Sequence, residues 1–278
     1  MDRTIPLRPL FRRHIALPQD HGSWVFLFSP LLIGLFTGGH WRPGAAPLIF
    51  GVMAAFLIRQ PVTVAVKVIS GRRTRDDLPA ALFWGTIYAL IGLVMLAWLI
   101  ALSWGYLLVL ALPGFPVFAW HLVLVSRRAE RRQIGVEVVG SGVLALAAPA
   151  AFWVGQGEPD PMGWVLFGLT WFQSAASIVY AYLRLRQREL KEIPVLSERF
   201  RMAGRALLYT TFNLAAVAGL SIGGLLPILL PLPYALQWAE SLWGSFIPAI
   251  QWKPTRIGFR QLVVSMLFTV LFILTWSL

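Results

Sequence analysis

A short series of polar and cationic side chains interrupts an apolar stretch of the chain near residue 60. Arg59, Thr63 and Lys67 recur every four residues, so on a helix they share one face. Ionisable groups inside a membrane segment are costly and mark ligand or ion sites, and arginine can hold a phosphate through two parallel hydrogen bonds. In the alternative interpretation, Lys67 reaches the lipid headgroups and Arg59 pairs with a carboxylate such as Glu137.

Gln60 and Pro61 lie within the same stretch. Proline removes a backbone donor and kinks a helix, so we expect free backbone groups beside the cationic face. Gln60 therefore counts with Arg59, Thr63 and Lys67 as a ligand-binding candidate.

A second polar face is predicted further along the chain. Its members follow one another at intervals of four, three and four residues: Gln173, Ser177, Tyr180 and Arg184. Gln and Ser could serve only in hydrogen bonds between helices, with Tyr180 at the membrane interface. The functional interpretation is a polar, basic pocket open to the cytoplasm. Together the two faces would bind phosphate, diphosphate or another anion.

Three acidic residues and one histidine complete the candidates. Glu137 is interpreted as the one acidic group clearly inside an apolar stretch, either a charge partner of nearby arginines or a general base. His21 stands just before Trp24 and is either an interfacial anchor or a ligand contact. Asp76 and Asp77 fit a helix N-cap better than a metal pair. No metal site is therefore expected.

The composition shows which elements must position these residues. Hydrophobic residues make up 58% of the chain and charged residues only 13%, which a soluble domain could not bury. The net charge is +12, but the cations stand in short gaps between apolar runs, where they face lipid headgroups rather than nucleic acid. Membrane lipid is the expected partner, and the residues identify neither a cofactor nor an oligomeric state.

The apolar runs predict an all-α bundle of about nine transmembrane helices, since a span needs about 20 apolar residues. We expect one integral membrane domain over 1–278, with a cytoplasmic tail at 1–21. The expected spans are 22–40, 43–69, two within 78–125, 134–155, 162–183, two within 206–250, and 259–278. The boundary between the seventh and eighth spans stays open, because several prolines and Glu240 interrupt that region.

The cations predict the orientation. They accumulate in the tail and in alternate gaps, at 67–75, 127–132, 184–205 and 253–260, whereas the opposite gaps hold only Arg42. Positive loops remain in the cytoplasm. The N-terminus is therefore expected inside and the C-terminus outside a bacterial inner membrane.

Several segments resemble the YwiC-like family of bacterial membrane proteins. They are QDHGSW at 19–24, FSPLLIG at 28–34, RQP at 59–61, APA at 148–150 and YAYLRLR at 180–186. The resemblance spans most of the chain and implies a membrane protein, but no reaction. The layout of nine helices, with polar faces on the second and sixth, is also similar to that of the UbiA-like intramembrane prenyltransferases.

The UbiA-like resemblance would imply carboxylates that hold magnesium against a prenyl diphosphate. Here the corresponding positions carry Arg59, Lys67, Tyr180 and Arg184, so magnesium-dependent ionisation is not expected. The first hypothesis is therefore a protein with a cytoplasm-facing cationic cavity that binds an anionic isoprenoid or lipid, as a metal-independent transferase or without catalysis. The alternatives are a small-anion permease and a non-catalytic assembly subunit.

Overall fold

The computed structural model describes residues 10–18, 21–129 and 133–278. Within these ranges the secondary structure is entirely helical, which confirms the predicted all-α class. Seven helical segments of the described chain are long and apolar enough to cross a membrane, as expected for a multi-pass membrane protein. They are Ala45–Ile69, Arg75–Ala101, Gly105–Ser126, Ile134–Gln156, Pro161–Gln187, Leu196–Ile222 and Pro254–Ser277.

The predicted count of nine spans is not confirmed. Two shorter helices overlap the other expected spans: α2 (His21–Thr37) has 17 residues and α11 (Pro231–Phe246) has 16. Both are shorter than the roughly 20 residues that cross a bilayer without adaptation. The expected first span, 22–40, extends three residues beyond the end of α2, whereas the sequence leaves the boundary between the seventh and eighth spans open.

The chain forms two compact units, and the single-domain organisation stays a prediction. The first unit contains the described residues of Met1–His21 together with Trp41–Val136, and the second contains Gly22–His40 and Glu137–Leu278. The helices of the first unit are α1 (Arg13–Ala16), α3 (Ala45–Ile69), η1 (Arg75–Asp77), α4 (Leu78–Ala101), η2 (Gly105–Leu107), α5 (Leu108–Ala111) and α6 (Gly114–Ser126).

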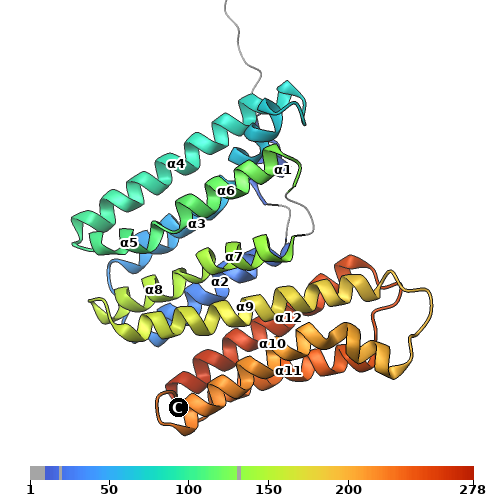
Figure 1. The fold of residues 1–278 in the computed structure, drawn as a ribbon. Helices are drawn as coiled ribbons and strands as arrows, with labels where there is room; N and C mark the ends of the chain where they lie inside the picture. Colours follow the sequence, from blue (N-terminus) through green and yellow to red (C-terminus); the bar gives the residue numbers. More distant parts are fainter. Residues whose placement is uncertain (1–9, 19–20, 130–132) are drawn as a thin grey trace, which may run out of the picture. The chain divides into compact units, whose positions relative to one another are not determined.

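In the first unit, α3 and α4 lie side by side (Figure 1). Ile15 of α1 is buried with Val64 and Val68 of α3 and with Ala80 and Ala81 of α4. These apolar side chains leave water together, which stabilises the pairing of the helices.

Asp77 occupies the position before α4 that the sequence predicts, but it does not cap the helix. Its side chain makes no capping hydrogen bond. Instead the buried carboxylate pairs with Arg12, and with Arg73 Nε at 2.8 Å. The capping interpretation was therefore wrong for Asp77, because two nearby guanidiniums offer stronger, charge-assisted bonds than a backbone amide.

The second unit is built around a long central helix. Its helices are α2 (His21–Thr37), α7 (Ile134–Ala145, which begins in the first unit), α8 (Ala147–Gln156), α9 (Pro161–Gln187), α10 (Leu196–Ile222), α11 (Pro231–Phe246) and α12 (Pro254–Ser277). Helix α9 lies against α8, α10, α11 and α12 (Figure 1). Asp160 begins α9 by accepting a hydrogen bond from the backbone N–H of Met162 at 2.6 Å, with Pro161 in the first turn.

Two glycines four residues apart bring α2 against α8. A methyl group added at Gly34 would lie 2.2 Å from the backbone oxygen of Ala148. One added at Gly38 would lie 3.0 Å from the oxygen of Phe152 and 3.1 Å from Cα of Gly155. Small residues at this spacing let membrane helices approach closely. The sequence analysis did not single out this pattern, although the spacing is visible in the chain.

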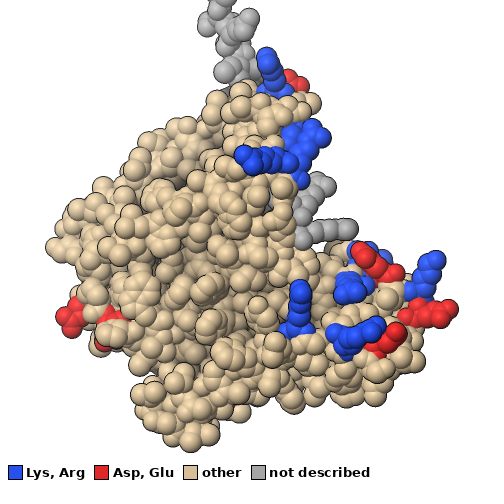
Figure 2. All heavy atoms as spheres, viewed as in Figure 1, with Lys and Arg blue, Asp and Glu red and all other residues tan. Residues whose placement is uncertain are grey.

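Charged side chains gather at the ends of the helices in the second unit. Figure 2 shows cations and acids where α9 meets α10 and where α11 meets α12, and only acidic spheres at the opposite end, near the turn from α8 to α9. Between the acidic end and the cations, the face shown carries a long stretch without charged side chains. This distribution is the one that a bilayer imposes on helices that cross it.

Candidate functional site

The cationic residues predicted near residue 60 lie on α3 of the first unit. Arg59, Gln60, Thr63 and Lys67 are all half-buried, and none lies in the core. The Gln60 amide donates to the backbone oxygen of His14 at 2.9 Å, and the Arg59 guanidinium lies 5.3 Å from the ring centroid of Phe56. Gln60 therefore ties α3 to α1, and a ligand-binding role of this face stays a prediction.

The second predicted face lies on α9 of the second unit and is much more deeply placed. Gln173, Tyr180 and Arg184 are buried and Ser177 is half-buried. The Ser177 hydroxyl accepts from the Gln173 amide at 3.1 Å and from the amide of Gln237, on α11, at 2.9 Å. The spacing correctly predicts a shared helix face, and this face points into the bundle.

The centre of the site is an ion pair between α11 and α12. Nε and Nη2 of Arg260 donate to the two carboxylate oxygens of Glu240, each at 2.6 Å. The Tyr180 hydroxyl donates to the same carboxylate at 2.9 Å. Glu240 is only 9% exposed, so these charge-assisted bonds keep an ionised carboxylate stable inside the bundle.

Arg184 joins α9 to the end of α11. Its Nη1 donates to Gln187 Oε1 at 2.8 Å, to the backbone oxygen of Gly244 at 3.0 Å and to that of Ile247 at 2.7 Å. The side chain is 2% exposed, and its Nη2 forms no hydrogen bond with any described residue. A buried guanidinium that meets neutral oxygens leaves a positive charge without a direct carboxylate partner.

Two tryptophans separate three guanidiniums in an alternating series, which we call the Arg–Trp series. The Trp252 ring centroid lies 4.0 Å from the guanidinium of Arg256 and 5.0 Å from that of Arg184. The Trp243 centroid lies 5.1 Å from Arg184 and 3.6 Å from Arg260. Each ring face attracts a cation. The series runs from the exposed Arg256 to the buried ion pair.

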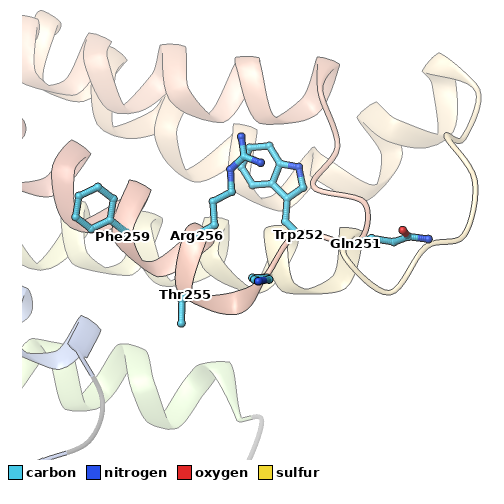
Figure 3. Close-up of a pocket in the computed structure, with 6 residues that line it drawn as sticks. Gln251, Trp252, Thr255, Arg256 and Phe259 are labelled. Atoms are coloured by element: carbon cyan, nitrogen blue, oxygen red, sulfur yellow. The ribbon is translucent and has the colours of Figure 1, made fainter.

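An open hollow begins at the outer end of the Arg–Trp series (Figure 3). It has a volume of about 480 Å³ and lies on the linker and first turns of α12, and Figure 3 shows the guanidinium of Arg256 over the indole of Trp252. Its walls are formed by Gln251, Trp252, Lys253, Thr255, Arg256 and Phe259. The hollow thus combines two cations, two aromatic rings and a helix N-terminus.

Two further predicted residues lie outside this site. Glu137, on α7, is exposed and accepts a hydrogen bond from the Tyr182 hydroxyl at 2.6 Å, and its predicted pairing with Arg59 stays a prediction. The side chain of His21 lies outside the described residues, although α2 begins at this residue.

The sequence analysis missed the residues that complete the site. Glu137 is not the one acidic group inside an apolar helix, because Glu240 lies within α11 and is buried. Arg260 was counted among the cations of a gap, yet it stands inside α12 and reaches Glu240. The available signal was a carboxylate and a cation in adjacent helices, both within predicted apolar regions.

Comparisons with known proteins agree with the family resemblance. The family model described as "YwiC-like protein" matches residues 17–152. The chain is also 24% identical over 175 residues to "Uncharacterized protein YwiC" of Bacillus subtilis (strain 168), which covers 62% of this chain and 68% of that protein. No solved structure matches the chain significantly. The resemblance to the YwiC-like family is confirmed, and the UbiA-like layout stays a prediction.

Proposed function

We propose that this YwiC-like, multi-pass membrane protein binds the phosphate-bearing headgroup of an anionic lipid, including a polyisoprenoid lipid, in the hollow at the start of α12. The observation that carries the proposal is one open hollow of about 480 Å³ lined by the cations Lys253 and Arg256 and by the rings of Trp252 and Phe259, with Arg256 stacked on Trp252. That volume lies within the range of about 300–1,000 Å³ of small-molecule sites.

The charges of the hollow favour an anion. Lys253 and Arg256 are both exposed, and neither forms an ion pair with a carboxylate among the described residues. Helix α12 begins at Pro254 without a side-chain cap, so the amides of its first turn add partial positive charge. The backbone N–H groups of Arg256 and Ile257 already donate to the Lys253 oxygen, so a phosphate group would accept its hydrogen bonds from the Lys253 and Arg256 side chains.

The Arg–Trp series strengthens this attraction. It holds Arg184, Arg256 and Arg260, and among the described residues the one carboxylate that pairs with them is Glu240, the partner of Arg260. The cluster therefore keeps an excess of positive charge at one end of a helical bundle. Because the surroundings have a low dielectric constant, the electric field of these cations is weakly screened and extends into the hollow.

The apolar part of a lipid also has a surface beside the hollow. Phe259 is exposed on the second turn of α12, and Val263, Met266 and Val270 continue along the same helix as exposed apolar side chains. In a bilayer such residues face acyl chains. An amphiphile could therefore keep its headgroup in the hollow while its chain follows α12.

The first test removes the two cations of the hollow. We expect Lys253→Gln/Arg256→Gln to lower the retention of phosphate-bearing lipid about tenfold, equivalent to about 1.4 kcal/mol of binding free energy. Native mass spectrometry of protein extracted in mild detergent measures the retained lipid. The matched control is Arg201→Gln/Arg205→Gln, which removes two exposed cations from α10. Equal retention in the two double variants would contradict the proposal.

Two further measurements separate this proposal from the other hypotheses. Because the proposed contacts are side-chain cations, chelating magnesium should change lipid affinity by less than about tenfold. Abolished binding would instead indicate a metal-dependent site of the UbiA-like type. Phosphate flux in liposomes, altered by the same Lys253 and Arg256 changes, would indicate an anion permease.

The second prediction concerns orientation, and it rests on the alternating cations. A reporter fused after Leu278 should read periplasmic, and one inserted at Arg188 should read cytoplasmic, because basic loops remain in the cytoplasm. The hollow would then face the cytoplasmic leaflet. A cytoplasmic reporter at Leu278 would contradict both the outward C-terminus and the count of nine spans.

A further inference from the structure

A small polar cavity lies inside the second unit, between α9, α11 and α12. Its volume is about 20 Å³, and it is separate from the open hollow at the start of α12. Seven side chains line it, and all but Val264 carry polar groups: Ser177, Tyr180, Gln237, Glu240, Gln261 and Ser265. Polar groups concentrated in the interior of a membrane bundle indicate a ligand or water site.

The cavity lining includes one hydrogen-bond acceptor and one hydrogen-bond donor that have no partner among the described residues. Oε1 of Gln237 is an acceptor and Nε2 of Gln261 is a donor, and both are buried and form no hydrogen bond with any described residue. The Gln237 side chain is 5% exposed. Leaving such atoms unpaired in a buried site is costly.

The orientation of the Gln237 amide is determined by its neighbours. Its Nε2 donates to the backbone oxygen of Gln173 at 3.0 Å and to the Ser177 hydroxyl at 2.9 Å. A backbone oxygen can only accept, so the amide cannot be turned over without losing this bond. Oε1 must therefore be the atom left without a partner.

We propose that this cavity binds one internal water molecule, which donates to Gln237 Oε1 and accepts from Gln261 Nε2. A cavity holds a water when its volume exceeds about 10–15 Å³ and it offers two to four polar partners, and this cavity meets both conditions. The water also lies beside the carboxylate of Glu240. It adds hydration to an ion pair that is otherwise buried among helices.

The chemistry of the lining favours water over a cation. Nε2 of Gln261 carries positive partial charge, and the guanidinium of Arg260 binds the Glu240 carboxylate that lines the same cavity. Both would repel a metal ion. A molecule that donates one hydrogen bond and accepts another matches the two unsatisfied atoms. The site does not depend on lipid binding at the hollow.

The test uses two buried tyrosines of the full-length protein in nanodiscs. X-ray hydroxyl-radical labelling converts bound water into radicals that modify adjacent side chains. Tyr180 lines the cavity and is 5% exposed, whereas Tyr234, on α11, is 1% exposed, donates to the Leu169 oxygen at 3.0 Å and does not line it. We expect Tyr180 to be labelled at least about fivefold faster than Tyr234, because only Tyr180 adjoins a bound water.

A variant checks that the labelling comes from this cavity. Gln261→Leu removes the donor and adds apolar volume next to the cavity, so Tyr180 labelling should fall to the rate of Tyr234. Equal labelling of the two tyrosines in the unaltered protein would overturn the proposal. It would also be overturned if the melting temperature rose with Na⁺ or K⁺ but not with choline, since that result would identify a cation site.

Discussion

Glu240→Leu is expected to lower the free energy of unfolding by about 3 kcal/mol. The substitution removes both bonds that Arg260 makes and the acceptor of the Tyr180 hydroxyl. Breaking a buried ion pair on one side typically costs about 3–5 kcal/mol, because the remaining charge stays desolvated. The lower end applies, since the Arg260 side chain is 39% exposed and can turn partly toward water. Denaturation by dodecyl sulfate in mixed micelles measures the change.

The double variant Glu240→Leu/Arg260→Leu should recover most of that loss, because no charge is left without a partner. The control pair is Glu198 and Arg201 on α10, 3.8 Å apart and exposed, where Glu198→Leu should change stability by less than about 0.5 kcal/mol. Equal losses of stability in Glu240→Leu and in Glu240→Leu/Arg260→Leu would show that the two side chains do not stabilise the bundle through their ion pair.

Gly34→Ala is expected to lower the free energy of unfolding by about 2–3 kcal/mol. The added methyl group would lie 2.2 Å from the backbone oxygen of Ala148 and 2.9 Å from Cβ of Ala151. Backbone atoms cannot turn aside as a long side chain can, so α2 must move away from α8. Overpacking of this kind typically costs about 1–3 kcal/mol, and the separation also weakens the close contact at Gly38.

Gly168→Ala is the matched control for the glycine prediction. Gly168 lies within α9, and an added methyl group would meet nothing within 4 Å. Alanine favours helix over glycine by up to about 1 kcal/mol, so this variant should be neutral or slightly stabilising. A Gly34→Ala protein as stable as the Gly168→Ala protein would show that α2 and α8 do not depend on their close approach.

The sequence alone determined the class of the protein and the polar face of α9. Apolar runs of about 20 residues, separated by short gaps that hold the cations, predict helices in a membrane, because a helix of that length crosses the bilayer and satisfies its own backbone hydrogen bonds. The interval of four, three and four residues places Gln173, Ser177, Tyr180 and Arg184 on one side of a helix, since helical geometry is local. The family resemblance also rested on local information, because it came from short contiguous motifs of the sequence.

The length of each helix was less predictable. Prolines and polar residues around α11 leave several acceptable boundaries, and the helix ends where Arg184 and Gln187 bind the oxygens of Gly244 and Ile247. Those bonds come from α9, which is distant in the chain. A boundary set by tertiary hydrogen bonds cannot be read from the residues on either side of it.

Only the tertiary structure decided the partners of the site. Glu240 and Tyr180 are 60 residues apart in the chain and 2.9 Å apart in space, and no local pattern relates a carboxylate on α11 to a guanidinium on α12. The sequence analysis offered Glu137 as one possible partner of Arg59 from estimated membrane depth, and that pairing stays a prediction. The hydrogen bond from Tyr182 to Glu137 was not foreseen. Periodicity identifies which residues share a face of a helix, but the neighbour of that face depends on how whole helices pack, and packing is a property of many distant side chains at once.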